Sequence, residues 1–315
     1  MALTGVEIPI LLVTLVIGPL ALVSLVVVAV LSARSASGPL PQTARAARRH
    51  AIATTAVASV VGLLAAVVAS GVAATSTGLA IGLWTGLVPA LAGLAFVGVH
   101  AAGEATWPRP AGQVRRASLQ RRTADDVAPR LLRTAATIWA ASLVVALIAF
   151  GLLADETSRA FRVTFADSSS TAGPFPGWFY GVPLLAATTV VALATWGALH
   201  LVAARAAVAD AAPHWDLALR RLSAHRILRG TQGVLGLTLA GVLGVAGNAL
   251  RTAGSGSSIN DVAQVDALAT GAGVTLMIAS ATVLLTTLVV LLVPGAPASL
   301  GAEPATGPAP EGDRP

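Results

Sequence analysis

The sequence predicts an all-α fold, a bundle of seven transmembrane helices in a multi-pass membrane protein. The first observation is composition: of 315 residues, 55% are apolar and only 11% are charged, against about 25% charged residues in a soluble domain. The second is that the apolar residues form long blocks without Asp, Glu or Arg, each long enough for the roughly 20-residue helix that crosses a bilayer. The third is the unequal distribution of arginine among the connections between these blocks.

The uncharged blocks define the spans in order. The block of residues 50–103 is long enough for two crossings, and a turn of small residues at 71–78 divides it. Residues 1–293 therefore form one transmembrane domain, with spans at about 8–32, 51–71, 79–100, 134–153, 181–204, 230–250 and 271–293. The first span is expected to be an uncleaved helix, because Glu7 precedes it and a signal peptide begins with positive charge. Residues 294–315, rich in Pro, Gly and Ala, are expected to be a disordered cytoplasmic tail.

Arginine predicts the orientation of these spans. The chain contains no lysine, so all 20 basic residues are arginine. The connections 33–50, 101–133 and 205–229 hold sixteen of them, and the connections on the opposite side hold three. By the positive-inside rule, the N-terminus is outside and the C-terminus inside a bacterial cytoplasmic membrane.

Two absences bear on chemistry. The chain contains no cysteine, which excludes disulfides, thiolate metal centres and a cysteine nucleophile. The expected spans contain no Asp, Glu or Arg, although proton-coupled pumps, voltage sensors and intramembrane hydrolases need ionisable groups at depth. We therefore expect no catalytic residue, no cofactor and no enzymatic activity.

Histidines at the cytoplasmic ends of the spans offer one alternative to this expectation. His100 and Glu104 lie one helical turn apart, and His200 ends another span at a similar depth. Two histidines and a carboxylate can hold a divalent metal, and two histidines on facing helices can hold a haem. The spacing matches no known metal motif, so interfacial histidines without a ligand are the simpler interpretation.

Two arginine-rich segments are the expected contact surfaces. In the connection 101–133, Trp107 and two prolines make a stiff turn next to several arginines, namely Arg109, Arg115, Arg116, Arg121 and Arg122. In residues 213–226, leucines alternate with Arg220 and Arg221, as in a short helix lying in the interface. Both segments suit anionic lipid headgroups, and the first also suits a soluble cytoplasmic protein. No glycine-rich phosphate loop or stacking platform of aromatic residues indicates nucleic-acid binding.

Small and aromatic residues supply two further expectations. Small residues recur at four-residue spacing in three spans, at 58–70, 82–90 and 236–244, which is typical of helix contact faces; a substrate groove is the alternative. The connection 154–180 gathers aromatic residues, of which Phe175, Trp178, Phe179 and Tyr180 are expected to form a belt at the membrane surface. A cap that gathers a ligand is the alternative there.

The stretches GEATWPRPAGQVRRASLQRR, from residue 103, and LALRRLSAHRILRG, from residue 217, resemble a family of uncharacterised multi-pass integral membrane proteins of actinobacteria. The resemblance implies a seven-span layout and brings no assigned activity, so it assigns no site residue.

The sequence favours a non-enzymatic membrane partner or permease-like component, whose arginine-rich loops meet headgroups or a soluble protein. A transporter of an apolar or weakly polar solute is the alternative, and an interfacial metal or haem enzyme is the third hypothesis.

Overall fold

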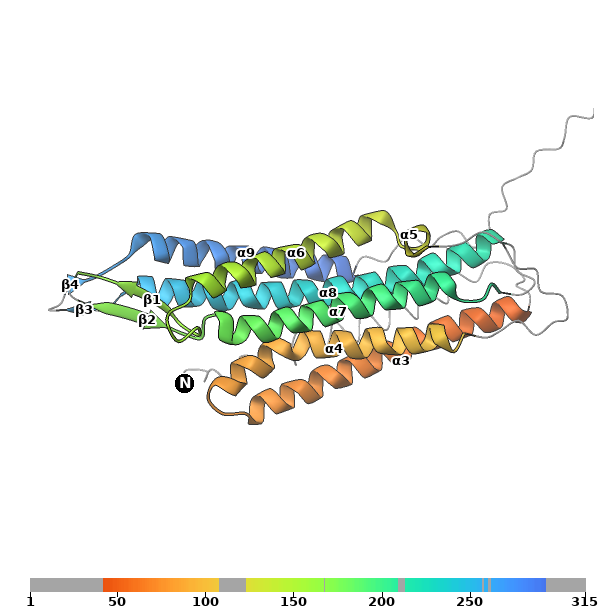
Figure 1. Ribbon diagram of the computed structural model, residues 1–315, viewed down its shortest axis with the longest axis horizontal. Coiled ribbons are helices and arrows are strands. Elements are labelled where there is room, and N and C mark those ends of the chain that lie inside the picture. The colour runs from red at the N-terminus through yellow and green to blue at the C-terminus, as the bar shows by residue number, and fades with distance from the viewer. Residues whose placement is uncertain are drawn as a thin grey trace, which may run out of the picture.

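The computed structural model describes residues 42–107, 123–166, 168–208, 213–256, 258–259 and 262–292. Six long helices form an elongated bundle (Figure 1), and they are α3 (Gln42–Thr75), α4 (Leu79–Ala105), α6 (Arg130–Leu153), α7 (Trp178–Ala204), α8 (Pro213–Gly254) and α9 (Ala267–Leu292). A single turn, α5 (Ala124–Val127), precedes α6. Two short antiparallel hairpins complete the fold, one of β1 (Phe161–Thr164) and β2 (Ser169–Ala172), the other of β3 (Ser258–Ile259) and β4 (Val262–Ala263).

All six long helices are long and apolar enough to cross a membrane, which is compatible with a multi-pass membrane protein. Each coincides with one of the expected spans, the last of which is described as far as residue 292. Large apolar side chains face outward from the bundle, among them those of Leu152, Trp196, Leu268 and Leu285, each more than half exposed. Such a surface is unfavourable in water but suits lipid. The expected first span, 8–32, and the expected tail, 294–315, lie outside the described residues.

The helices alternate in direction, which separates the connections into two ends (Figure 1). The arginine-rich starts of α3, α6 and α8 lie at one end, together with the last residues of α4 and α7. Both hairpins and the turn between α3 and α4 lie at the other end. This arrangement is the one that the alternation of arginine-rich and arginine-poor connections predicts. We refer below to the arginine-rich end and the hairpin end.

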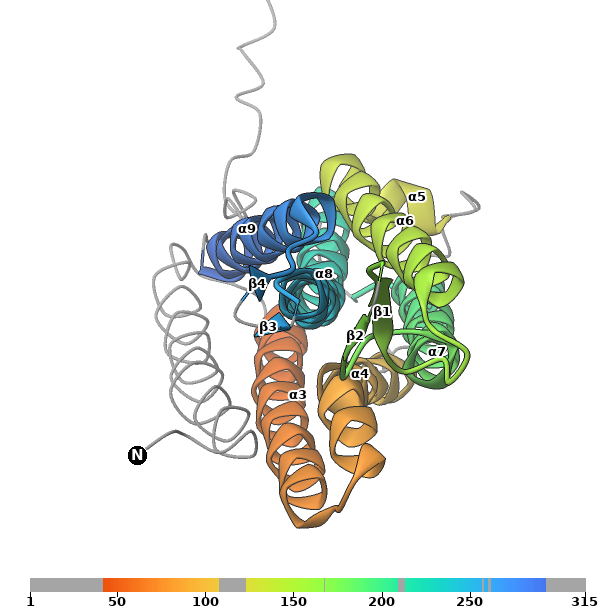
Figure 2. The same ribbon diagram turned by 90° about the vertical axis from the view of Figure 1, so that its left-hand side faces the viewer.

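Helix α8 occupies the centre of the bundle (Figure 2). In its apolar window 61% of the residues are buried, against 6–33% in the other five helices. Its 42 residues rise about 63 Å, roughly twice the 30 Å thickness of the hydrocarbon core. The separate interfacial helix expected at residues 213–226 is wrong: this segment is the start of α8. Its apolar side chains, including Trp215 and Leu219, pack against α3 and Trp107 instead of lying in the interface.

Two of the three small-residue stripes form helix contacts. On α8, a Cβ added at Gly236 would meet the side chain of Thr287, and one at Gly244 would lie 3.0 Å from Ser280 Oγ, both on α9. On α3, a Cβ at Gly62 would lie 3.3 Å from the carbonyl oxygen of Ala92 on α4. The packing interpretation is therefore confirmed for the stripes of α3 and α8.

The aromatic residues of the connection between α6 and α7 do not all form a surface belt. Phe175 is fully buried, and its ring centroid lies 5.5 Å from those of Phe150 and Phe161. Tyr180 is also buried, whereas Phe179 is exposed. The belt is thus wrong for Phe175 and Tyr180. Figure 2 shows β1 and β2 over the space between α7 and α8, where they cover the hairpin end of the bundle.

Candidate ligand-binding cavity

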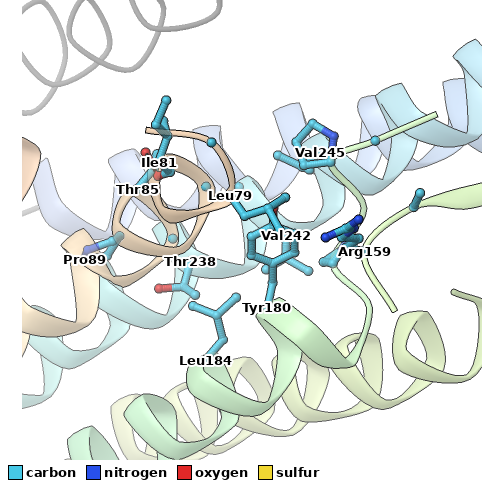
Figure 3. Close-up of a pocket in the computed structure, with 18 of the residues that line it drawn as sticks. Leu79, Ile81, Thr85, Pro89, Arg159, Tyr180, Leu184, Thr238, Val242 and Val245 are labelled. Carbon is cyan, nitrogen blue, oxygen red and sulfur yellow. Dashed lines mark hydrogen bonds between the residues drawn. The ribbon is translucent and has the colours of Figure 1, made fainter. Parts of the chain in front are cut away.

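A cavity of about 670 Å³ lies between α4, α7 and α8 at the hairpin end (Figure 3). Its volume falls in the range of roughly 300–1,000 Å³ found for small-molecule sites. The connection between α6 and α7 frames its mouth. The lining residues are Gly78, Leu79, Ile81, Gly82, Thr85, Gly86, Pro89, Arg159, Ala160, Gly173, Pro174, Pro176, Tyr180, Leu184, Leu237, Thr238, Gly241, Val242 and Val245.

The cavity exists because α4 and α8 are in close contact at one level and separate toward the hairpin end. At the close level, a Cβ added at Gly93 on α4 would lie 2.5 Å from Val234 Cγ2 on α8, and Gly230 on α8 lies against the ring of Phe96. Two to three turns further, a Cβ at Gly241 would meet nothing within 4 Å. Pro89 lies between these levels and removes one backbone hydrogen bond from α4. The space that opens is the cavity.

The wall of the cavity is almost entirely apolar. Its two threonines use their hydroxyl hydrogens within their own helices: Thr85 donates to the carbonyl oxygen of Ile81 at 2.7 Å, and Thr238 to that of Val234 at 2.9 Å. Such threonines offer a ligand only an acceptor. The small-residue stripe on α4 lines this space, since Gly82 and Gly86 face the side chains of Tyr180 and Leu184 across its edge. This stripe therefore contacts side chains of α7, as the packing interpretation expects, and also lines the cavity, as the groove interpretation expects.

The lining residues that can donate hydrogen bonds to a ligand lie at the mouth of the cavity. Arg159 supplies the only charge among the described lining residues, and Tyr180 reaches the cavity from the first turn of α7 (Figure 3). The turn before Arg159 is held by Asp155, whose carboxylate accepts hydrogen bonds from the hydroxyl of Thr157 at 2.7 Å and the amide of Ala160 at 3.3 Å. These bonds lower the pKa of Asp155, that from the Thr157 hydroxyl most strongly. The carbonyl oxygen of Arg159 in turn accepts from the amide of Phe175 at 2.8 Å.

The arginine-rich end is instead closed by a buried polar network. Arg205 Nη1 donates to Glu104 Oε2 at 2.9 Å, which joins the end of α7 to α4. Arg220 on α8 donates to Asp216 Oδ2 at 2.9 Å and to three carbonyl oxygens at the end of α7, those of Val202, Ala203 and Arg205. Carbonyls at a helix C-terminus lack partners within the helix, so Arg220 satisfies them and neutralises the negative end of the helix dipole.

Trp107 belongs to the same network. The guanidinium carbon of Arg205 lies 3.7 Å from the centroid of the Trp107 ring, and His50 packs against that ring edge-on at 5.3 Å. Burial lowers the pKa of Arg205, while the carboxylate of Glu104 raises it. A guanidinium remains charged in proteins, so the Glu104 carboxylate and the Trp107 ring are what stabilise this buried cation.

The histidine and carboxylate candidates for a metal or haem are not brought together. Within the described residues, which include all three candidates, no group of three His, Cys, Asp or Glu side chains could hold a metal ion. Glu104 pairs with Arg205, His100 is buried against Phe96, and His200 is exposed beside Trp196. The metal and haem interpretation of His100, Glu104 and His200 is therefore not supported by their geometry.

The residues expected to contact headgroups or a partner differ in their exposure. Trp107 and Arg220 are buried at 6% and 1% exposure, so the expected contact with headgroups or a partner is corrected for both: they are internal contacts of the bundle. Arg221, one position later on α8, is exposed. The other expected contacts, Arg109, Arg115, Arg116, Arg121 and Arg122, lie outside the described residues.

The chain matches no protein-family model, and no curated protein or solved structure is significantly similar to it. Function must therefore be argued from the cavity and the surfaces themselves. The sequence analysis did not find the cavity. Its one available signal was the glycine stripe on α4, which looks in sequence like the packing stripes on α3 and α8.

Proposed function

We propose that this protein is a non-enzymatic, permease-like component of a bacterial cytoplasmic membrane that takes an apolar or weakly polar solute into the cavity between α4, α7 and α8. The observation that carries this proposal is the cavity itself, a space of about 670 Å³ with an almost wholly apolar wall. A hydrophilic cargo would lose its hydration there without finding replacement hydrogen bonds, because the threonine hydroxyls of the wall already donate to their own helices.

The two ends of the bundle support a carrier-like role. The cavity opens at the hairpin end. At the arginine-rich end, ion pairs and hydrogen bonds connect α4, α7 and α8 through the side chains of Glu104, Arg205, Asp216 and Arg220. A carrier that admits solute from one side requires this combination of one open and one closed end. The proposal concerns binding and access, and it involves no covalent chemistry.

In this proposal residues 8–32 form a seventh span, and the arginine-rich end faces the cytoplasm, as the positive-inside rule favours. The exposed Arg221 and the arginines of the connection 101–133 would then contact anionic headgroups or a soluble cytoplasmic protein. The cavity would open toward the opposite face.

A photoreactive probe tests the proposal in the membrane. We expect a long-chain fatty alcohol with a diazirine in its chain to label the walls of the cavity in proteoliposomes. Gly241→Phe fills the open space on α8 and is expected to reduce this labelling several-fold. Gly98→Phe is the matched control, because Gly98 is an equally unobstructed glycine on α4 that does not line the cavity. Labelling spread over the lipid-facing surfaces of α6 and α9, and unchanged by Gly241→Phe, would refute the proposal.

A further inference from the structure

Two hydrogen-bond donors at the mouth of the cavity have no partner among the described residues. Tyr180 as a whole is 7% exposed, and its hydroxyl makes no hydrogen bond to these residues. The hydroxyl oxygen is open to the cavity and is not sealed inside the protein (Figure 3). A ligand in the cavity can therefore accept a hydrogen bond from this hydroxyl.

The guanidinium of Arg159 is the second such donor. It lies at the mouth beside Tyr180 (Figure 3), and no ion pair or hydrogen bond of its side chain joins it to any described residue. The nearest carboxylate along the chain, that of Asp155, is already occupied by Thr157 and Ala160. Arg159 is exposed, so its guanidinium is accessible to a ligand that enters at the mouth. The buried guanidinium groups of Arg205 and Arg220 are instead paired with carboxylates.

The cavity continues from these donors along α4 into the membrane. On α4 its lining runs from Leu79 to Pro89, eleven residues that rise about 16 Å along the helix. This is about half the thickness of the hydrocarbon core. Below the donors the wall offers Leu184, Leu237 and Val242, along with glycines that present bare backbone. The site thus combines a cationic mouth at the membrane surface with an apolar channel toward the membrane centre.

We infer that the ligand of this cavity is an amphiphile with one anionic group and one apolar chain, such as a fatty acid or an anionic lipid. Its carboxylate or phosphate accepts hydrogen bonds from Arg159 and Tyr180, and its chain lies along α4 between α7 and α8. This orientation matches that of lipids in the surrounding leaflet, with the charge at the surface and the chain inward. The inference rests on the proposed function: the apolar chain is the part of the solute that the cavity takes up, and the anionic group stays at the mouth.

Two photoreactive probes that share one apolar chain but differ in headgroup charge test this inference separately from the proposed function. We expect a diazirine fatty acid to label the cavity at about tenfold lower concentration than its neutral methyl ester, because a charge-assisted hydrogen bond near solvent has about that effect. Arg159→Gln should remove most of this advantage, and Tyr180→Phe part of it, while labelling by the ester stays unchanged. Tyr180→Phe removes only the unpartnered hydroxyl and retains the ring that packs on Gly82.

Arg162→Gln is the matched control, since Arg162 lies on β1 near the mouth, does not line the cavity and donates to Thr171. An equal loss in Arg162→Gln would indicate general attraction to a cationic surface and would overturn the inference. Equal labelling by acid and ester would also overturn it, yet would leave the proposed function intact. If neither probe labels the cavity, both proposals fail.

Displacement of the acid probe distinguishes two sources of the ligand. Displacement by unlabelled oleate would identify a free acid as the ligand, and displacement by phosphatidylglycerol alone would identify a membrane lipid. Both results support an anionic amphiphile.

Discussion

Buried arginine distinguishes this chain at the residue scale. Arg205 and Arg220 have side chains that are 0% and 2% exposed, and each donates to a carboxylate at 2.9 Å. From sequence alone both count toward the positive-inside pattern, because the pattern depends on the number of arginines and carries no information about burial. Glu104 is distant in sequence from its partner Arg205, and Asp216 is four residues before its partner Arg220. No sequence motif marks either carboxylate as the partner of a buried arginine. The network was therefore not predictable from residue types.

The charge of Glu104 is needed to keep Arg205 inside the bundle. We expect Glu104→Gln to lower the free energy of unfolding by about 3–5 kcal/mol, the usual cost of leaving a buried charge without its partner. The exposed pair of Arg133 with Asp125 is the control, and Asp125→Asn should cost no more than about 1 kcal/mol. Thermal unfolding in detergent, followed by tryptophan fluorescence, measures both. Equal effects of the two substitutions would show that the buried pair does not stabilise the bundle.

At the scale of elements, hydropathy located the spans but not the full helices. The expected span 230–250 is only the second half of α8, which begins at Pro213. The earlier half contains four arginines and reads as a surface segment, but its apolar side chains pack against α3. Likewise, small-residue spacing identified three stripes, and only the structure shows that the stripe on α4, besides contacting side chains of α7, lines a cavity. Spacing shows where a backbone can be approached closely, whether by a helix or by a ligand.

The contact between α8 and α9 includes a close backbone approach at Gly273. A Cβ added at Gly273 would lie 2.5 Å from the backbone nitrogen of Arg251, and backbone cannot move aside as a flexible side chain can. We expect Gly273→Ala to destabilise the bundle by about 1–3 kcal/mol. Gly271→Ala, two residues earlier on α9, meets nothing within 4 Å and should be neutral or stabilising, because alanine favours helix. Unfolding midpoints in detergent compare the two, and a Gly273→Ala variant as stable as Gly271→Ala would contradict the close approach of α8 and α9.

For the whole molecule, the sequence predicted the all-helical fold and the separation of two ends, because both follow from the alternation of apolar blocks and arginine-rich connections. It did not predict the cavity. The separation of α4 from α8 beyond Gly93 and Val234 depends on helix contacts that are far apart in sequence. The donors at the mouth, Arg159 and Tyr180, come from a connection that the residue pattern assigned to the membrane surface.

The central claim is that the cavity and the arginine-rich network lie at opposite faces of one membrane. The chain contains no cysteine, so single cysteines can be labelled without background. Thr77 and Thr157 lie at the hairpin end, Thr123 lies at the arginine-rich end, and all three are exposed. We expect a membrane-impermeant maleimide, added to intact cells, to label Thr77→Cys and Thr157→Cys, and to label Thr123→Cys only after the membrane is opened. Labelling of all three from the same side would contradict the account.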